Sequence, residues 1–262
     1  MNRIQIVATL GPASSDLQTI NSMIRAGMSI ARLNFSWGTH AAHRSFVADI
    51  RLAASQAGVV IPIIQDLSGP RVQAGADHTM DTNIPVITEK DLTDIKAVAD
   101  LHIEYVALSF VKDAADIAQL RTHLAAAGSH AKVIAKIERP EAIENIDSII
   151  SACDGIMIAR GDLGEAIPFA TLPFVKKDIL KRCVTAGKPA IVATEMLTSM
   201  IASDRPSRAD VSDIAHAVLD GASATMLSNE TAVGAHPVMA IEVMRTVVDE
   251  AIQHAEQDVV MF

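Results

Sequence analysis

Short apolar segments rich in isoleucine and valine recur along the chain, and most lack the strict polar alternation of a strand with one solvated face. Such segments are typical of strands that are buried on both faces, as in a parallel sheet. The pattern predicts eight strands, at residues 4–10, 29–33, 59–64, 105–108, 133–137, 155–159, 190–193 and 224–227.

Between these strands, apolar residues recur at the spacing of one face of an α-helix. The predicted helices cover residues 14–26, 39–57, 91–100, 113–127, 140–151, 172–186, 208–219 and 237–254. Eight strand–helix units in about 250 residues predict an α/β protein with the (β/α)8 TIM-barrel fold. The alternative, an open doubly wound sheet, usually carries a G-x-G-x-x-G loop after its first strand, and the TLGPASS segment lacks that pattern.

The connection at residues 67–90 differs from the others. Gly, Pro, Asp, Asn and Thr are scattered through it, with little periodicity. This predicts a loop without secondary structure of its own, and such long loops tend to be functional. We therefore expect one domain, residues 1–262, with this loop as its one irregular connection.

Composition and charge exclude several classes of protein. The 262 residues carry a net charge of −9 and only eight aromatic side chains, whereas nucleic-acid binding needs a basic face and stacking rings. No apolar run approaches the ~20 residues of a membrane span. The two cysteines, Cys153 and Cys183, exclude a thiolate zinc site and fit a reducing compartment. We expect a cytoplasmic protein that acts on small molecules, with no nucleic-acid or membrane partner.

Polar and charged residues collect where the predicted strands end, which is the face of a TIM barrel that carries the chemistry. Because side chains alternate along a strand, residues two positions apart share a face. The strand ends carry Arg32, Asn34 and Ser36, then Asp66, then Lys136 and Glu138, then Arg160 and Asp162, then Thr194 and Glu195, and finally Ser228, Asn229 and Glu230.

These residue types indicate a specific chemistry. Glu138 and Asp162 come from adjacent strands, and two carboxylates completed by water or substrate oxygens form the usual Mg²⁺ or Mn²⁺ site. Lys136 and Arg32 add fixed positive charge beside it. A metal, a lysine and an arginine that face one point form a clamp for a phosphoryl group or an enolate oxygen. Gly161 lets backbone N–H groups approach a ligand carboxylate.

Longer motifs resemble the catalytic barrel of the pyruvate kinase family. They follow one another over nearly the whole chain: ATLGPAS at 8–14, ARLNFSWG at 31–38, QDLSGP at 65–70, ALSFVKDAADI at 107–117, AKIERPEAIENID at 135–147, DGIMIARGDLG at 154–164, VATEMLTSM at 192–200 and PSRADVSDIAHAVLDGASATMLSNETAVG at 206–234. A set of this length, in this order, is highly specific.

The resemblance implies a role for each candidate residue. Glu138 and Asp162 are then the divalent-metal ligands. Lys136 stabilises the phosphoryl group in transfer and the enolate that it leaves. Arg32 then binds the phosphate. The carboxylate of phosphoenolpyruvate is bound by Gly161, Asp162 and Thr194. A monovalent cation is bound by Asn34, Ser36 and Asp66.

The chain departs from the family pattern at several points. Family members carry a lid domain inserted after the third strand, where this chain has only residues 67–90, and a further C-terminal domain, before which this chain ends. The substituted positions are Trp37 for His, Leu67 for Thr, Ser68 for Lys, Gln73 for Arg and Asn229 for Gly. Trp37 and Gln73 lie on the nucleotide side of the site. The phosphoenolpyruvate half is therefore expected to be complete and the ADP half altered.

One departure bears on the monovalent cation. K⁺-dependent members have Glu after the Gly-Pro that follows the third strand, and this chain has Arg71 there. A guanidinium held near Asp66 would supply the charge that K⁺ brings, and two cations there would repel each other. The resemblance allows K⁺ at the site, and Arg71 predicts that it is not required.

Three functions fit these residues. The first is metal-dependent phosphoryl transfer between phosphoenolpyruvate and ADP, giving pyruvate and ATP through a pyruvate enolate. The second is a nucleotide-independent lyase, decarboxylase or aldolase that acts on pyruvate enolate or an oxo acid. The third is a non-catalytic phosphoenolpyruvate-binding protein. A homodimer through the barrel helices is compatible with each of them.

Overall fold

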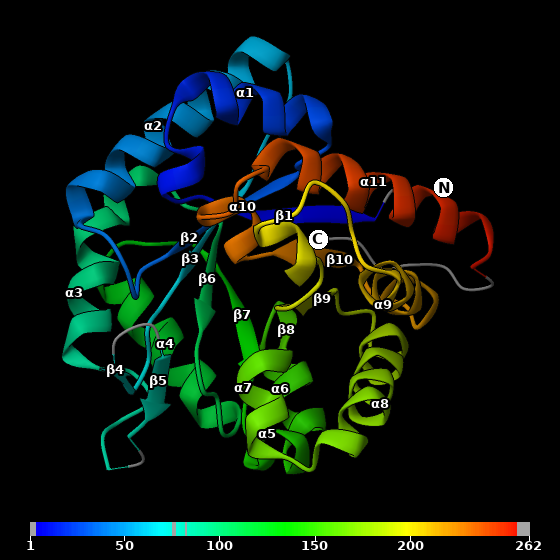
Figure 1. Ribbon diagram of the computed structural model, residues 1–262. Coiled ribbons are helices and arrows are strands. Elements are labelled where there is room, and N and C mark those ends of the chain that lie inside the picture. Colours follow the sequence, from blue (N-terminus) through cyan, green and yellow to red (C-terminus); the bar gives the residue numbers. More distant parts are fainter. Residues whose placement is uncertain (1–3, 75–76, 82, 256–262) are drawn as a thin grey trace.

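The computed structural model describes residues 4–74, 77–81 and 83–255. Eight parallel strands close into a barrel in the order β1-β10-β9-β8-β7-β6-β3-β2, and helices surround it (Figure 1). The strands are β1 (Gln5–Thr9), β2 (Ile30–Asn34), β3 (Ile63–Asp66), β6 (Tyr105–Leu108), β7 (Lys132–Ile137), β8 (Gly155–Ala159), β9 (Ala190–Ala193) and β10 (Ala224–Leu227). The predicted (β/α)8 barrel is confirmed.

The helices that cover the barrel follow the strands in the chain. They are α1 (Leu17–Ala26), α2 (His40–Ala57), α3 (Glu89–Val98), α4 (Ala114–Ala126), α5 (Pro140–Glu144), α6 (Ile146–Ala152), α7 (Arg160–Ala166), α8 (Leu172–Thr185), α9 (Arg208–Leu219), α10 (Asn229–Ala232) and α11 (Pro237–Gln253). Short 3-10 turns lie at η1 (Pro12–Ser14), η2 (Ala99–Leu101), η3 (Phe169–Thr171) and η4 (Thr198–Ile201). Within the described residues, no helix is long and apolar enough to cross a membrane.

Some predicted element boundaries need correction. The third strand begins at Ile63, because Pro62 has no N–H to donate to the ladder, and Val60 is 81% exposed. The helix predicted at 140–151 is divided at Asn145 into α5 and α6. Helix α3 begins two residues early, because Thr88 caps it and accepts a hydrogen bond from the Asp91 N–H.

The segment at residues 67–90 contains a β-hairpin, so the prediction of a loop without secondary structure is wrong. Strand β4 (Arg71–Ala74) pairs antiparallel with β5 (Asp77–Met80), with Arg71 opposite Met80. Strands of four residues are too short to show a reliable alternation in sequence. Figure 1 shows the hairpin beside the barrel, near α3 and α4.

The barrel interior is filled by one apolar cluster to which every barrel strand contributes. Its members are Val7, Ile30, Ile64, Tyr105, Ala107, Ile134, Met157, Ile191, Ala193, Ala224 and Met226. A larger cluster fills the space between the strands and the helices. The interior is therefore a packed core, and a site can form only where this core ends.

Candidate active site

The interior face of the barrel changes from apolar to charged at the carboxyl ends of the strands. Lys136 lies two positions after the interior Ile134, and Asp66 lies two positions after Ile64. Because side chains alternate along a strand, both stay on the interior face. Arg32 joins them from β2, and all three are buried.

Lys136 is the centre of a buried network. Its Nζ donates a hydrogen bond to Ser109 Oγ at 2.6 Å and lies 3.1 Å from Asp66 Oδ1 and 3.0 Å from Glu138 Oε1. An ammonium group carries three N–H donors, and three oxygens of the chain surround this one. The side chain is 5% exposed, so the ion pairs are shielded from water.

Asp66 joins Lys136 to a second cation. Arg32 Nε donates to Asp66 Oδ2 at 2.6 Å, and Arg32 Nη1 donates to Thr9 Oγ1 at 2.9 Å. Thr9 Oγ1 donates in turn to the Leu227 carbonyl at 2.9 Å. These bonds hold the guanidinium in one orientation at the end of the barrel.

The pKa values of the three buried groups depend on the balance between burial and ion pairing. Burial would raise the pKa of Asp66, but the charges of Arg32 and Lys136 outweigh it and keep that pKa below its usual value. Burial would lower the pKa of Lys136, but Asp66 and Glu138 outweigh it and raise that pKa. The pKa of Glu138 is raised, mainly because the carboxyl group is buried, although the charge of Lys136 acts in the opposite direction. Lys136 is therefore a cation at neutral pH and Asp66 an anion.

Glu138 and Asp162 are the two carboxylates to which the sequence analysis assigns a divalent metal. Glu138 Oε2 accepts a hydrogen bond from the Phe110 N–H at 2.7 Å, whereas the buried Oε1 receives none and has only its ion contact with Lys136. Asp162 lies in the first turn of α7, and its charge adds to the burial that raises the pKa of Glu138. A dication would relieve this repulsion. Among the described residues no cluster of three or more His, Cys, Asp or Glu could hold a metal, so water and substrate would complete the shell, as they usually do for Mg²⁺.

Thr194 and Gly161 meet across the ends of β9 and β8. The Gly161 N–H donates to Thr194 Oγ1 at 2.8 Å, and that hydroxyl donates to the Ala193 carbonyl at 2.6 Å. A Cβ at Gly161 would lie 3.6 Å from Thr194 Oγ1, so a side chain there would project toward the hydroxyl. The backbone of Gly161 and the hydroxyl of Thr194 are thus in direct contact at the ends of these strands.

Arg160 fixes the backbone of this region. Thr194 has φ 68° and Glu195 has φ 56°, the left-handed region that non-glycine residues rarely adopt. The buried Arg160 donates from Nε to the Ala193 carbonyl at 3.3 Å and from Nη2 to the Thr194 carbonyl, and it pairs with Asp213 of α9. One guanidinium therefore joins the start of α7 to the end of β9.

Comparison with known proteins gives the family. A family model of the pyruvate kinase barrel domain matches residues 1–84 and 76–241. The pyruvate kinase of Mycobacterium intracellulare is 32% identical over 94% of this chain and 69% of its own length, and that of Geobacillus stearothermophilus is 33% identical over 97% and 58%. The chain belongs to the pyruvate kinase family. The family resemblance predicted from the motifs is confirmed.

The relatives are longer than this chain within the matched region. The chain spans 58% of the Geobacillus stearothermophilus pyruvate kinase and 56% of that of Sporosarcina psychrophila. The alignment with the Mycobacterium intracellulare protein extends over 327 positions although this chain has 262 residues, so that relative has residues without a counterpart here. The two parts of the family-model match overlap at residues 76–84. The expectation that residues 67–90 stand in place of the family's lid domain stays a prediction.

The residues assigned to a monovalent cation lie on neighbouring strand ends, where Asn34 is paired with Asp66 in the ladder between β2 and β3. Asn34 Oδ1 accepts a hydrogen bond from the Ser36 N–H at 3.1 Å, which closes a local turn after β2. Asp66 also forms ion pairs with Arg32 and Lys136. The monovalent site in this member of the pyruvate kinase family stays a prediction.

Arg71 reaches the site beside Asp162. Its Nη2 is 4.0 Å from Asp162 Oδ2, whereas the ion pairs of Asp66 are with Arg32 and Lys136. The charge of Arg71 also acts on Lys136, where it opposes the rise in pKa that Asp66 and Glu138 cause. The expectation of a guanidinium near Asp66 that takes the place of K⁺ stays a prediction.

Sequence reasoning missed Ser109 as a site residue. Its hydroxyl accepts from Lys136 Nζ and donates to the Leu67 carbonyl at 2.7 Å. The signal that could have found it is its position, two residues beyond the interior Ala107, in the register that also places Asp66 and Lys136.

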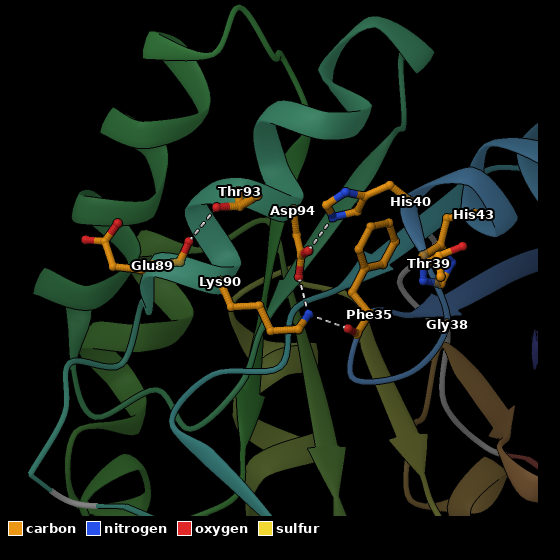
Figure 2. Close-up of a pocket in the computed structure, with 9 residues that line it drawn as sticks. All are labelled: Phe35, Gly38, Thr39, His40, His43, Glu89, Lys90, Thr93 and Asp94. Atoms are coloured by element: carbon orange, nitrogen blue, oxygen red, sulfur yellow. Dashed lines mark hydrogen bonds and ion pairs between the residues drawn. The ribbon is translucent and has the colours of Figure 1, made fainter.

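A cavity of about 510 Å³ lies beside the site, between α2 and α3 (Figure 2). Its buried Asp94 accepts from Lys90 at 2.6 Å and contacts His40 Nε2 at 2.7 Å. Lys90 also donates to the Phe35 carbonyl at 2.6 Å. These bonds fix the turn that follows Asn34, so the cavity wall supports the site from outside the barrel.

Proposed function

We propose that this chain is a pyruvate kinase-like phosphotransferase that moves the phosphoryl group of phosphoenolpyruvate to ADP and gives pyruvate and ATP. One observation carries the proposal: the Lys136 ammonium is buried between Asp66 and Glu138 at the point where Arg32 and Asp162 also converge. Membership of the pyruvate kinase family supports it. The direct test is pyruvate formation that requires both phosphoenolpyruvate and ADP.

The proposed reaction needs charge stabilisation at two places. The bond between phosphorus and the enol oxygen breaks, and a terminal oxygen of ADP forms a new bond to phosphorus. The enol oxygen keeps the electron pair, and the enolate then takes a proton at its methylene carbon to give pyruvate. Lys136 stabilises the negative charge on that oxygen, and Arg32 orients the phosphoryl group. Thr194 and Gly161, whose N–H donates to the Thr194 hydroxyl, would bind the carboxylate.

Glu138 and Asp162 would hold the Mg²⁺ or Mn²⁺ ion, which when bound neutralises charge on the substrate oxygens. We expect Glu138→Gln to weaken Mn²⁺ binding at least about tenfold, because a neutral amide replaces one of two anionic ligands. Isothermal titration with MnCl₂, alone and with oxalate, measures this, and oxalate should tighten binding to wild type by adding ligand oxygens.

The matched control for that measurement is Glu141→Gln. Glu141 is half exposed and pairs with Arg139 at 2.6 Å, away from the barrel interior. It should bind Mn²⁺ like wild type. Equal binding by Glu138→Gln and wild type would show that the metal lies elsewhere.

We propose further that the reaction does not require K⁺. Each site carboxylate already has a cationic partner: Asp66 has Arg32 and Lys136, and Asp162 has Arg71 at 4.0 Å. A further cation at Asp66 would be repelled by two charges within about 4 Å. Replacing K⁺ by tetramethylammonium should change the rate less than about twofold, because the fixed cations already supply the charge. A strong requirement for K⁺ would contradict the assignment.

The alternatives share the enolate chemistry and differ in the acceptor. A nucleotide-independent lyase, decarboxylase or aldolase would use Lys136 in the same way. It is favoured by Trp37, a half-exposed side chain on the expected nucleotide side that departs from the family pattern. A non-catalytic phosphoenolpyruvate-binding protein would retain only affinity. The cytoplasmic location and the homodimer also stay predictions, and Phe169 and Phe174 are exposed aromatic side chains on η3 and α8 that helix pairing could cover.

A further inference from the structure

The chain that follows β3 crosses the end of β6 on a fixed path. The Leu67 N–H donates to the Ala107 carbonyl at 3.0 Å, and the Gly69 N–H donates to Asp91 Oδ1 at 3.2 Å. Gly69 has φ +63°, and a Cβ there would lie 3.0 Å from Ser109 Cβ and 3.2 Å from the Phe110 ring. Only glycine fits this turn without displacing its neighbours. The turn at Gly69 therefore directs the chain so that Arg71 lies at the site.

Arg71 reaches the side of the site opposite to Arg32. In the order of the closed barrel, β8 lies four strands from β2 in either direction. Arg32 belongs to β2, and the guanidinium of Arg71 lies beside Asp162, which follows β8. The two guanidinium groups therefore face the site from opposite sides.

The Arg71 guanidinium is enclosed but incompletely bonded. The side chain is 14% exposed, its Nε is buried without a hydrogen-bond partner, and its contact with Asp162 is 4.0 Å long, beyond hydrogen-bond distance. Buried donors without a partner are uncommon and require an explanation. A guanidinium presents its donors in a planar fork that suits the oxygens of a phosphate group.

We propose that Arg71 binds the phosphoryl group of the substrate from the side opposite to Arg32 and so makes the site select phosphorylated over non-phosphorylated ligands. This rests on the proposed function, because it places the phosphoryl group between the two arginines and beside Lys136. The carboxylates Asp66, Glu138 and Asp162 match the three cations in charge. A phosphorylated ligand and a divalent ion can therefore enter together without a large charge imbalance.

Competitive isothermal titration in saturating Mn²⁺ tests the proposal with two probes, phosphoenolpyruvate and oxalate, a dianion without a phosphoryl group. The measured quantity is the ratio of their dissociation constants, because an effect of Arg71 on metal affinity acts on both probes. In Arg71→Met we expect phosphoenolpyruvate to lose at least about tenfold relative to oxalate, the size of a lost charge-assisted hydrogen bond. Arg71→Lys should keep part of the preference.

Val72→Met is the matched control, since Val72 is the next residue of the same hairpin and is half exposed. It should leave the ratio unchanged. An unchanged ratio in Arg71→Met, with wild type binding both probes, would overturn the role of Arg71 and leave the proposed function intact. Failure of wild type to bind Mn²⁺ and oxalate would instead overturn the proposed function, and this inference with it.

Discussion

Replacing Lys136 by methionine should lower Mg²⁺-dependent exchange of the pyruvate methyl protons in D₂O by about a thousandfold. The exchange passes through the enolate, and Lys136 is the buried cation that would lie beside the enolate oxygen. Loss of one electrostatic donor aimed at a developing oxyanion has an effect of this order. Proton NMR of pyruvate follows the exchange directly and needs no nucleotide.

The same substitution affects stability, and the experiment must separate the two effects. Methionine would leave Asp66 and Glu138 buried without their shared cation, which costs about 3–5 kcal/mol. Thermal unfolding monitored by circular dichroism measures that loss. Adding Glu138→Gln to Lys136→Met removes the buried carboxylate charge that, among the described residues, had Lys136 as its one cationic contact, and it should recover part of the stability. It should not recover exchange, and near-normal exchange in either folded variant would exclude Lys136 from the enolate chemistry.

The groups of the interior face were predictable from sequence because they obey the strand period. Arg32, Lys136 and Glu138 follow apolar strand residues at alternate positions, and strand order then brings them to one end of the barrel. The motifs of the family added the roles. Ser109 obeys the same period, but a serine alone carries no sign that it binds an ammonium group.

The position of Arg71 was not predictable for a different reason. It depends on a left-handed turn at Gly69 and on the Asp91 carboxylate, 22 residues beyond Gly69, that holds this turn. The positive φ of Thr194 depends likewise on Arg160, a residue of another strand end. Contacts of this kind are set by tertiary packing, and a single sequence does not show them.

We expect proton exchange of pyruvate to survive better in this protein than phosphoryl transfer to ADP. The groups that we propose to act on the enolate are fixed by the fold: Lys136 is held by two carboxylates, and Thr194 is held against Gly161. Their orientation depends on the barrel and not on a lid.

Phosphoryl transfer needs in addition a nucleotide held in line with the phosphoryl group and shielded from water. On that side, Trp37 is 51% exposed, and among the described residues of the 67–90 segment the covering structure is a hairpin of two four-residue strands. Poor positioning of one reactant lowers a reaction rate about a hundredfold. We therefore expect the rate of phosphoryl transfer to be lower than the rate of proton exchange by at least that factor.

Both reactions should be measured on one preparation, with Lys136→Met as the variant that loses both and Trp37→Ala as the variant that separates them. If Trp37 contributes nothing to nucleotide binding, Trp37→Ala changes neither rate. The contrary result is phosphoryl transfer that is as fast as exchange in wild type and that falls in Trp37→Ala while exchange does not. That result would show that the indole binds the nucleotide, and the expectation of slow transfer would be wrong. Exchange without transfer would assign the chain to the nucleotide-independent alternative. Absence of both, with phosphoenolpyruvate still bound, would leave a binding protein, because the same buried Lys136 network can recognise a phosphorylated acid without turning it over.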